Sequence, residues 1–237
     1  MSHLADYAPV VPPMISALIV HCVQEIESRG LQEKSTYRVS GSERDVKVLK
    51  ERFLKNKTIP HLGNIDLHVL CGCIKDFLRS LSEPLIPRTL WETFCNAVQN
   101  QPDKDIVRHL THTLAFLILH FQRTAESPEV STPLKNLARV CAPTIFGNSS
   151  GDLEQGAILA EIYAQCTIME NLLKIPREQW IPYVSLETEE ENSQNSTNLL
   201  RTANRQNKGL MYSLYATPFK TTLKKRKFFE TPPDGKN

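Results

Sequence analysis

Residues 66–84 read DLHVLCGCIKDFLRSLSEP. Apolar side chains recur here every three or four positions, which is the spacing of one face of an α-helix. Asp66 is a residue type that caps a helix N-terminus, and Pro84 cannot continue a helix. The stretch therefore predicts an amphipathic helix. The residues expected on its buried face are Leu67, Leu70, Cys71, Ile74, Phe77, Leu78 and Leu81.

Comparable patterns on both sides of this stretch predict further helices. We expect them at residues 15–29, 43–53, 89–98, 105–125, 133–141 and 158–173. Ser40 and Glu43 fit a capping box at the start of the second helix. No segment alternates between polar and apolar residues as a half-buried strand would. Many helices with short connectors predict an all-α fold, a single helical bundle with one core, over residues 1–186.

Two prolines set the expected limits of the helix before the last one. Pro133 suits the first position of a helix, and Pro143 is expected to end it. The apolar residues of the last helix also fall at helical spacing. Its buried side is expected to consist of Ile158, Ile162, Cys166, Met169 and Leu173.

The composition changes after Leu186. Residues 187–198 are acidic and then rich in Ser, Asn and Thr, with almost nothing apolar to bury. Such a segment cannot offset the entropy lost on ordering, so we predict that residues 187–237 form a disordered tail. This tail holds nine Lys/Arg and six Asp/Glu, whereas the preceding residues hold 19 and 20. The basic character therefore belongs to the tail.

Several function classes are disfavoured by the sequence. It contains no phosphate-binding G-x-x-x-x-G-K-[ST], no G-x-G-x-x-G and no H-E-x-x-H motif. The nearest approach to a metal cluster is His61, His68, Cys71 and Cys73, but two cysteines two positions apart on a helix face different directions. A net charge of +2 does not by itself indicate nucleic acid. We expect no metal, no cofactor and no DNA or RNA partner.

The sequence contains no recognisable signal peptide or membrane-spanning segment. Residues 1–13 show no basic segment followed by an apolar one, and no 18 apolar residues run together. The six cysteines form no C-x-x-C pair, and most fit apolar helix stripes. We therefore expect a cytoplasmic protein with reduced thiols, part of which is associated with the cytoskeleton or the nucleus.

Three short segments carry the functional information. They read YRVSG at residues 37–41, KDFLRSLSEPL at 75–85 and NLARVCAPT at 136–144. In this order and at this spacing they resemble the three signatures of Rho GTPase-activating (RhoGAP) domains, and the resemblance extends roughly from Leu4 to Val184. Within the family, residues 5–23 are most similar to the centralspindlin-type Rac GTPase-activating proteins and their rotund-type relatives.

This resemblance implies a helical bundle of the RhoGAP type and a role for each matching residue. Arg38 matches the arginine finger that is inserted in trans beside the GTP of a Rho-family GTPase such as Rac, Cdc42 or Rho. Lys75 and Arg79 match basic residues that hold the finger loop and the GTPase switch surface, and Asn136 matches a polar contact to the GTPase. An arginine suits the finger because its planar, permanently charged fork stabilises the charge that builds up on the phosphate oxygens.

Two departures from the family pattern leave an alternative open. Residues 34–36 read KST, where the family usually has a glycine and then an apolar residue. A glycine there indicates a backbone position with an unusual φ. The chain also lacks a stretch of roughly three helical turns before the helix that contains residues 113–122, and this loss is expected to expose apolar surface or force repacking. The alternative is a catalytically weak or inactive module that binds Rho-family GTPases as a scaffold or effector.

The tail has features of its own. Residues 223–229 read LKKRKFF, a pattern found in nuclear-import signals, anionic-membrane patches and docking peptides, and also in merely solvated basic runs. Thr217-Pro218-Phe219-Lys220 has the form favoured by proline-directed kinases, and Thr231-Pro232 is a weaker case. Phosphate added beside the basic run would reduce its attraction to anions.

Overall fold

Helix α3 (Leu67–Arg79) forms where the sequence predicts a helix, but it ends before Leu81, and Leu67 and Leu81 are only half-buried. The Asp66 carboxylate caps the helix. Its Oδ1 accepts hydrogen bonds from the backbone amides of His68, at 2.8 Å, and Val69, at 3.3 Å. The helix packs against α1 (Ala17–Arg29), α2 (Glu43–Asn56) and α6 (Leu134–Phe146). It is thus buried on more than one side. Both Cys71 and Cys73 are buried although they face different directions.

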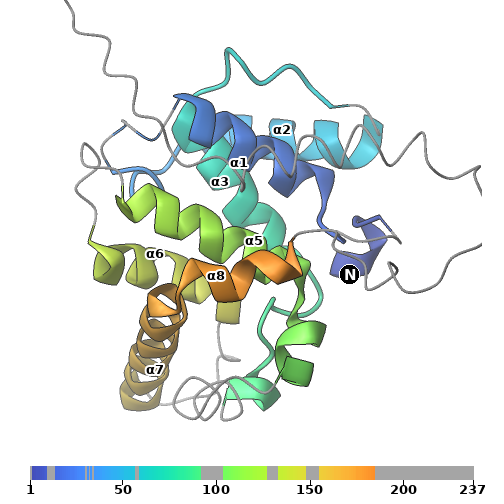
Figure 1. Ribbon diagram of the computed structural model, residues 1–237. Coiled ribbons are helices and arrows are strands. Elements are labelled where there is room, and N and C mark those ends of the chain that lie inside the picture. Colours follow the sequence, from blue (N-terminus) through green and yellow to red (C-terminus); the bar gives the residue numbers. More distant parts are fainter. Residues whose placement is uncertain are drawn as a thin grey trace, which may run out of the picture. The chain divides into compact units, whose positions relative to one another are not determined.

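Figure 1 shows the computed structural model, in which residues 2–9, 14–29, 31, 33, 35–56, 59–91, 104–126, 133–147 and 155–184 are described. The remaining helices in these ranges are α5 (Lys104–Glu126), α7 (Gln155–Lys174), α8 (Arg177–Trp180) and the 3₁₀ helices η1 (Leu4–Asp6), η2 (Arg88–Leu90) and η3 (Ile181–Tyr183). These ranges contain no strand, only an isolated parallel bridge between Ser2 and Leu81. The all-α prediction is confirmed.

Helix α5 supplies the middle of the core. Its run from Leu114 to Phe121, apolar except for His120, is buried throughout. The helix packs against α1, α6, α7, α8 and η3, and in Figure 1 α1, α2 and α3 gather on one side of it while α7 lies on the other. A helix that is apolar on nearly every side is what such a position requires. Even so, no helix in the described part of the chain is long and apolar enough to span a membrane.

The predicted ends of two helices are wrong. The hydroxyl of Ser42, not that of Ser40, accepts the amide of Asp45 at the start of α2. Pro143 lies inside α6, which continues to Phe146, and Pro133 occupies the cap position rather than the first turn. An interior proline costs a helix about 3 kcal/mol. Burial of the side chains on both sides of Pro143 offsets this cost, so tertiary packing overrides the local stop signal.

The buried side predicted for α7 is right only in the second half of the helix. Met169 and Leu173 are buried as expected, together with Ile168 and Leu172, and Cys166 is half-buried. The first half differs, because Ile158 and Ile162 are exposed next to the still more exposed Leu159 and Tyr163. Burial begins at Gln165, whose side-chain amide donates to the carbonyl of Gly147 at the end of α6, at 2.9 Å.

Two further expectations lie mainly or wholly outside the described residues. Of the helix predicted at 89–98, only η2 and Trp91 are described. The tail predicted at 187–237 lies outside them altogether, so its disorder stays a prediction.

Candidate functional site

The residues before Arg38 adopt a backbone that side chains normally avoid. We call residues 35–41 the Arg38 loop; it leads into α2. Ser35 has φ = 64° and Tyr37 has φ = 69°, both in the left-handed region. The unusual φ expected at Ser35 from the family's glycine is therefore confirmed. Thr36, which stands in place of an apolar residue, is buried and donates its hydroxyl to the carbonyl of Glu33, at 2.7 Å.

Tyr37 fastens the loop from within. Its side chain is fully buried, and its ring lies nearly perpendicular to the Phe121 ring, with centroids 5.3 Å apart. The phenol oxygen lies 2.8 Å from Nε2 of His120 on α5. Burial raises the pKa of the Tyr37 phenol well above its usual value, so the hydroxyl stays protonated. The side chain next to Arg38 is thus held deep in the core.

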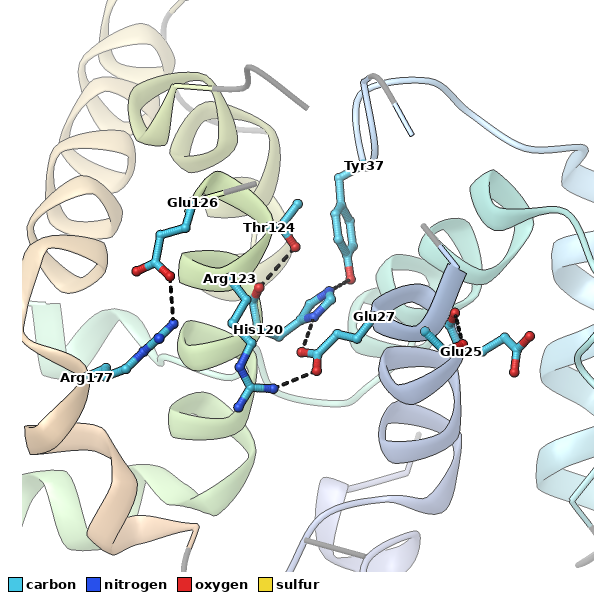
Figure 2. A network of polar contacts seen from close by, with 9 residues as sticks. Glu25, Glu27, Tyr37, His120, Arg123, Thr124, Glu126 and Arg177 are labelled. Carbon is cyan, nitrogen blue, oxygen red and sulfur yellow. Dashed lines mark hydrogen bonds and ion pairs between the residues drawn. The ribbon is translucent and has the colours of Figure 1, made fainter. Parts of the chain in front are cut away.

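A buried chain of polar contacts continues from His120, as Figure 2 shows. Nδ1 of His120 lies 2.9 Å from Oε1 of Glu27 on α1, and Arg123 donates to Oε2 of Glu27 at 2.6 Å. Burial raises the pKa of Glu27, but the hydrogen bonds and positive charge of His120 and Arg123 outweigh it, and the net pKa is lowered. None of these residues is among the site residues predicted from the sequence. The available clue was a histidine inside an apolar run, which once buried needs hydrogen-bond partners.

Lys75 holds the main chain of the same loop. Its ammonium group donates to the carbonyl of Tyr37 at 2.8 Å. Burial lowers the pKa of Lys75. At the end of the loop, Gly41 lies against the start of α3, where a Cβ on this residue would come within 2.5 Å of the amide nitrogen of Val69. Glycine is therefore required here by close approach of two backbone segments.

Arg38 itself points out of this anchored frame. Its side chain is exposed, while its amide donates to the carbonyl of Ser35 at 2.9 Å and the amide of Val39 to the same oxygen at 3.2 Å. A tight turn therefore presents a permanently charged guanidinium to the surroundings. Among the predicted site residues, the structure joins Lys75 to this loop directly.

Arg79 and Asn136 are placed on the neighbouring helices. Arg79 closes α3, one turn after Lys75, and its guanidinium reaches the hydroxyl of Thr144 on α6, at 3.4 Å. Asn136 is exposed in the first turn of α6. These positions are compatible with contact to a partner protein. The roles that the resemblance assigns to Arg38, Lys75, Arg79 and Asn136 stay predictions.

The described residues offer no alternative chemistry at this site. Within them, no group of three or more His, Cys, Asp or Glu side chains is arranged to hold a metal ion. Burial raises the pKa of the Cys71 thiol to about 12 and raises that of Cys141 as well, so both stay protonated and unreactive. The main functional group of the site is thus the exposed guanidinium of Arg38, on a loop held by hydrogen bonds from two helices.

Comparison with known proteins gives the family. The chain is 39% identical over 203 residues to the Rac GTPase-activating protein 1 of Mus musculus. The matched region covers 81% of this chain and 32% of the mouse protein. It thus spans about a third of that relative's length. The crystal structure of human Rho GTPase activating protein 15 superposes with a TM-score of 0.61 at 27% identity, over 73% of this chain and 87% of that one.

A more distant structure shares the fold. The crystal structure of the BH domain from Graf, the GTPase regulator associated with focal adhesion kinase, has a TM-score of 0.56 at 21% identity, over 71% of this chain and 94% of that one. The family model described as RhoGAP domain matches residues 16–150, which include the Arg38 loop, α3 and α6. The chain therefore belongs to the RhoGAP domain family.

Proposed function

We propose that this protein is a GTPase-activating protein for Rho-family GTPases, and that it supplies Arg38 to the GTP of its partner. The observation that carries the proposal is the contrast within one dipeptide: Tyr37 is fully buried and Arg38 is exposed. An arginine that stabilises a transition state in trans needs a fixed point of departure and an open path to the partner. The Arg38 loop provides both.

The surroundings of Arg38 support this role. Lys75 donates a hydrogen bond to the Tyr37 carbonyl and so holds the main chain of the loop. Arg79 and Asn136, on α3 and α6, add an exposed cation and an exposed amide for a GTPase in its GTP-bound form. The name of the mouse relative, Rac GTPase-activating protein 1, favours Rac as a partner. Neither a cofactor nor a metal of its own is needed, because the GTPase brings the nucleotide and its Mg²⁺.

The second candidate function is a binding module without catalysis. Ser35 favours it, because a non-glycine residue at positive φ costs the loop about 1–2 kcal/mol and weakens its hold on Arg38. Such a module would dock on the same GTPase and leave its hydrolysis rate unchanged.

One experiment separates the two functions. Phosphate release is measured from GTP-loaded Rac, Cdc42 and Rho with the wild-type protein, Arg38→Ala and Arg52→Ala. Arg52 is a matched control, because it is an exposed arginine on α2. We expect the wild type and Arg52→Ala to accelerate release equally, and Arg38→Ala to lose roughly 10³-fold or more in rate while binding is mostly kept. Binding without acceleration would support the module, and absence of binding would contradict both functions.

We further propose that residues 210–237 contact other partners. The run at 224–227, four cations beside two aromatics, suits an anionic membrane or an import receptor, and Thr217-Pro218 suits a proline-directed kinase. A cytoplasmic protein with a nuclear or cytoskeletal fraction would follow. Deletion of residues 210–237 tests this proposal, and an unchanged distribution in cells would contradict it.

A further inference from the structure

We propose that Glu27, His120 and Arg123 form a positioning network for the reaction. Acting through Tyr37, they fix the backbone from which Arg38 leaves and so set the maximal rate of hydrolysis rather than the affinity for the GTPase. This inference rests on the function proposed above. It concerns residues that do not touch the nucleotide themselves.

The direction of the hydrogen bonds to Glu27 follows from elementary chemistry. A carboxylate only accepts, and the two oxygens of Glu27 face His120 and Arg123. Nδ1 of His120 therefore carries a proton. In the neutral ring Nε2 is then an acceptor, and the Tyr37 hydroxyl donates to it. In the charged ring Nε2 donates to the Tyr37 oxygen instead, so in either state the Tyr37 hydroxyl is held against His120.

The network acts directly on the loop. The Tyr37 side chain is held by α5 through its hydroxyl and through ring contacts with His120 and Phe121. Its carbonyl is held by α3 through Lys75. A residue fixed at both its side chain and its main chain cannot rotate, and Arg38 is the next residue. The network therefore limits the orientations from which the guanidinium starts.

Stability alone is a weak reason for such a network. A buried ion pair seldom stabilises a fold more than well-packed apolar side chains of the same volume. The Glu27 and His120 side chains are 9% and 0% exposed, so their polar groups must be fully paired to be tolerated. Unlike apolar packing, hydrogen bonds fix the orientation of the groups they join. In this network the oriented group next to Arg38 is Tyr37.

The test compares Tyr37→Phe, which removes one oxygen atom and keeps the ring, with the wild type and with a control. Gln122→Met is the matched control, because Gln122 is a buried polar residue on the same helix that donates to the carbonyls of Leu173 and Ile175 instead. We expect kcat of the stimulated hydrolysis to fall about five- to tenfold in Tyr37→Phe, the scale of one buried hydrogen bond, with KM unchanged within about twofold. Gln122→Met is expected to keep the wild-type kcat.

A double-mutant comparison excludes a merely structural role. Tyr37→Phe is introduced into Arg38→Ala, where positioning no longer matters. We expect no further fall in kcat in this background. A wild-type kcat in Tyr37→Phe, or an equal fall in both backgrounds, would overturn the inference while leaving the proposed function intact.

A second readout needs no GTPase. The amides of Arg38 and Val39, which donate to Ser35, report the order of the loop through their hydrogen exchange. We expect exchange to be about tenfold faster in Tyr37→Phe and in Glu27→Gln, and unchanged in Gln122→Met. Should the wild type stimulate no GTPase, the proposed function fails, and unchanged exchange in both network variants would separately overturn the positioning.

Discussion

The Arg38 loop and the first half of α7 are opposites. The loop has no regular secondary structure and two residues at positive φ, yet Tyr37 is 0% exposed and is held by side chains from two helices. The first half of α7 is a regular helix, yet Leu159 is 68% and Tyr163 73% exposed. Regular backbone geometry is therefore a poor guide to how firmly a segment is held. In this molecule the irregular segment is the anchored one.

A pair of tyrosine truncations, one in each region, is expected to show the largest difference in stability. Tyr37→Ala empties a fully buried site and breaks a buried hydrogen bond, so we expect the free energy of unfolding to fall by about 3–5 kcal/mol. Tyr163→Ala should change it by no more than about 0.5 kcal/mol. Urea unfolding followed by circular dichroism measures both. Similar losses in the two variants would show that the loop is not better anchored than α7.

A pair of glycine substitutions gives effects of opposite sign. In Gly41→Ala the new methyl group meets the backbone of α3, and we expect a loss of about 1–3 kcal/mol. In Gly156→Ala it meets nothing within 4 Å, and the higher helix propensity of alanine should stabilise α7 by about 0.5 kcal/mol. Thermal unfolding of the two variants measures the difference. A stabilising Gly41→Ala would contradict the close approach of the loop to α3.

The positioning network of Glu27, His120 and Arg123 is expected to make the stability of the fold depend on pH. The pKa of Glu27 is lower in the folded protein than its usual value of about 4.5. Its ionised form therefore stabilises the fold above that pH, and the contribution is lost as the pH falls below it. We expect the free energy of unfolding of the wild type to exceed that of Glu27→Gln by about 1–3 kcal/mol at pH 7. This difference should narrow below pH 4.5. Urea titrations at several pH values measure the difference, and a constant one would contradict this role of the carboxylate.

The smallest expected effect comes from restoring a glycine in the loop. Ser35→Gly removes the cost of a left-handed serine, about 1–2 kcal/mol, but adds chain entropy to the unfolded state. The net gain should be about 0.5 kcal/mol, with a modest rise in kcat because the loop is held more tightly. A stability measurement together with a rate assay checks both. A lower kcat would mean that serine does not weaken the presentation of Arg38.

Much of the fold could be predicted from the sequence because it depends on local patterns. Most of the buried stripe of α3 and the long apolar run of α5 follow from helical spacing, and the cap at Asp66 follows from its residue type. The errors arise where distant contacts decide. Pro143 stays inside α6 because its neighbours are buried, and Ile158 stays exposed in the described structure because nothing placed there covers it. The predicted loss of a stretch before residues 113–122 stays a prediction.

The site was predictable in part for the same reason. The position of Arg38, the unusual φ of Ser35 and the helical places of Lys75 and Asn136 follow from short motifs. The chain of contacts from Tyr37 to His120 and Glu27 does not, because it joins residues 83 and 93 positions apart. No local periodicity encodes such a contact. It emerges only when α1, α5 and the loop are packed together.

Whether Arg38 is catalytic is decided by the maximal rate of phosphate release from GTP-loaded Rac, measured at saturating concentrations of the protein. We predict that the wild type raises this rate strongly and that Arg38→Ala removes roughly 10³-fold or more of the increase, while half-saturation changes little. A wild type that saturates Rac without raising the rate, or an Arg38→Ala variant as fast as the wild type, would contradict the claim that the Arg38 loop presents a catalytic arginine.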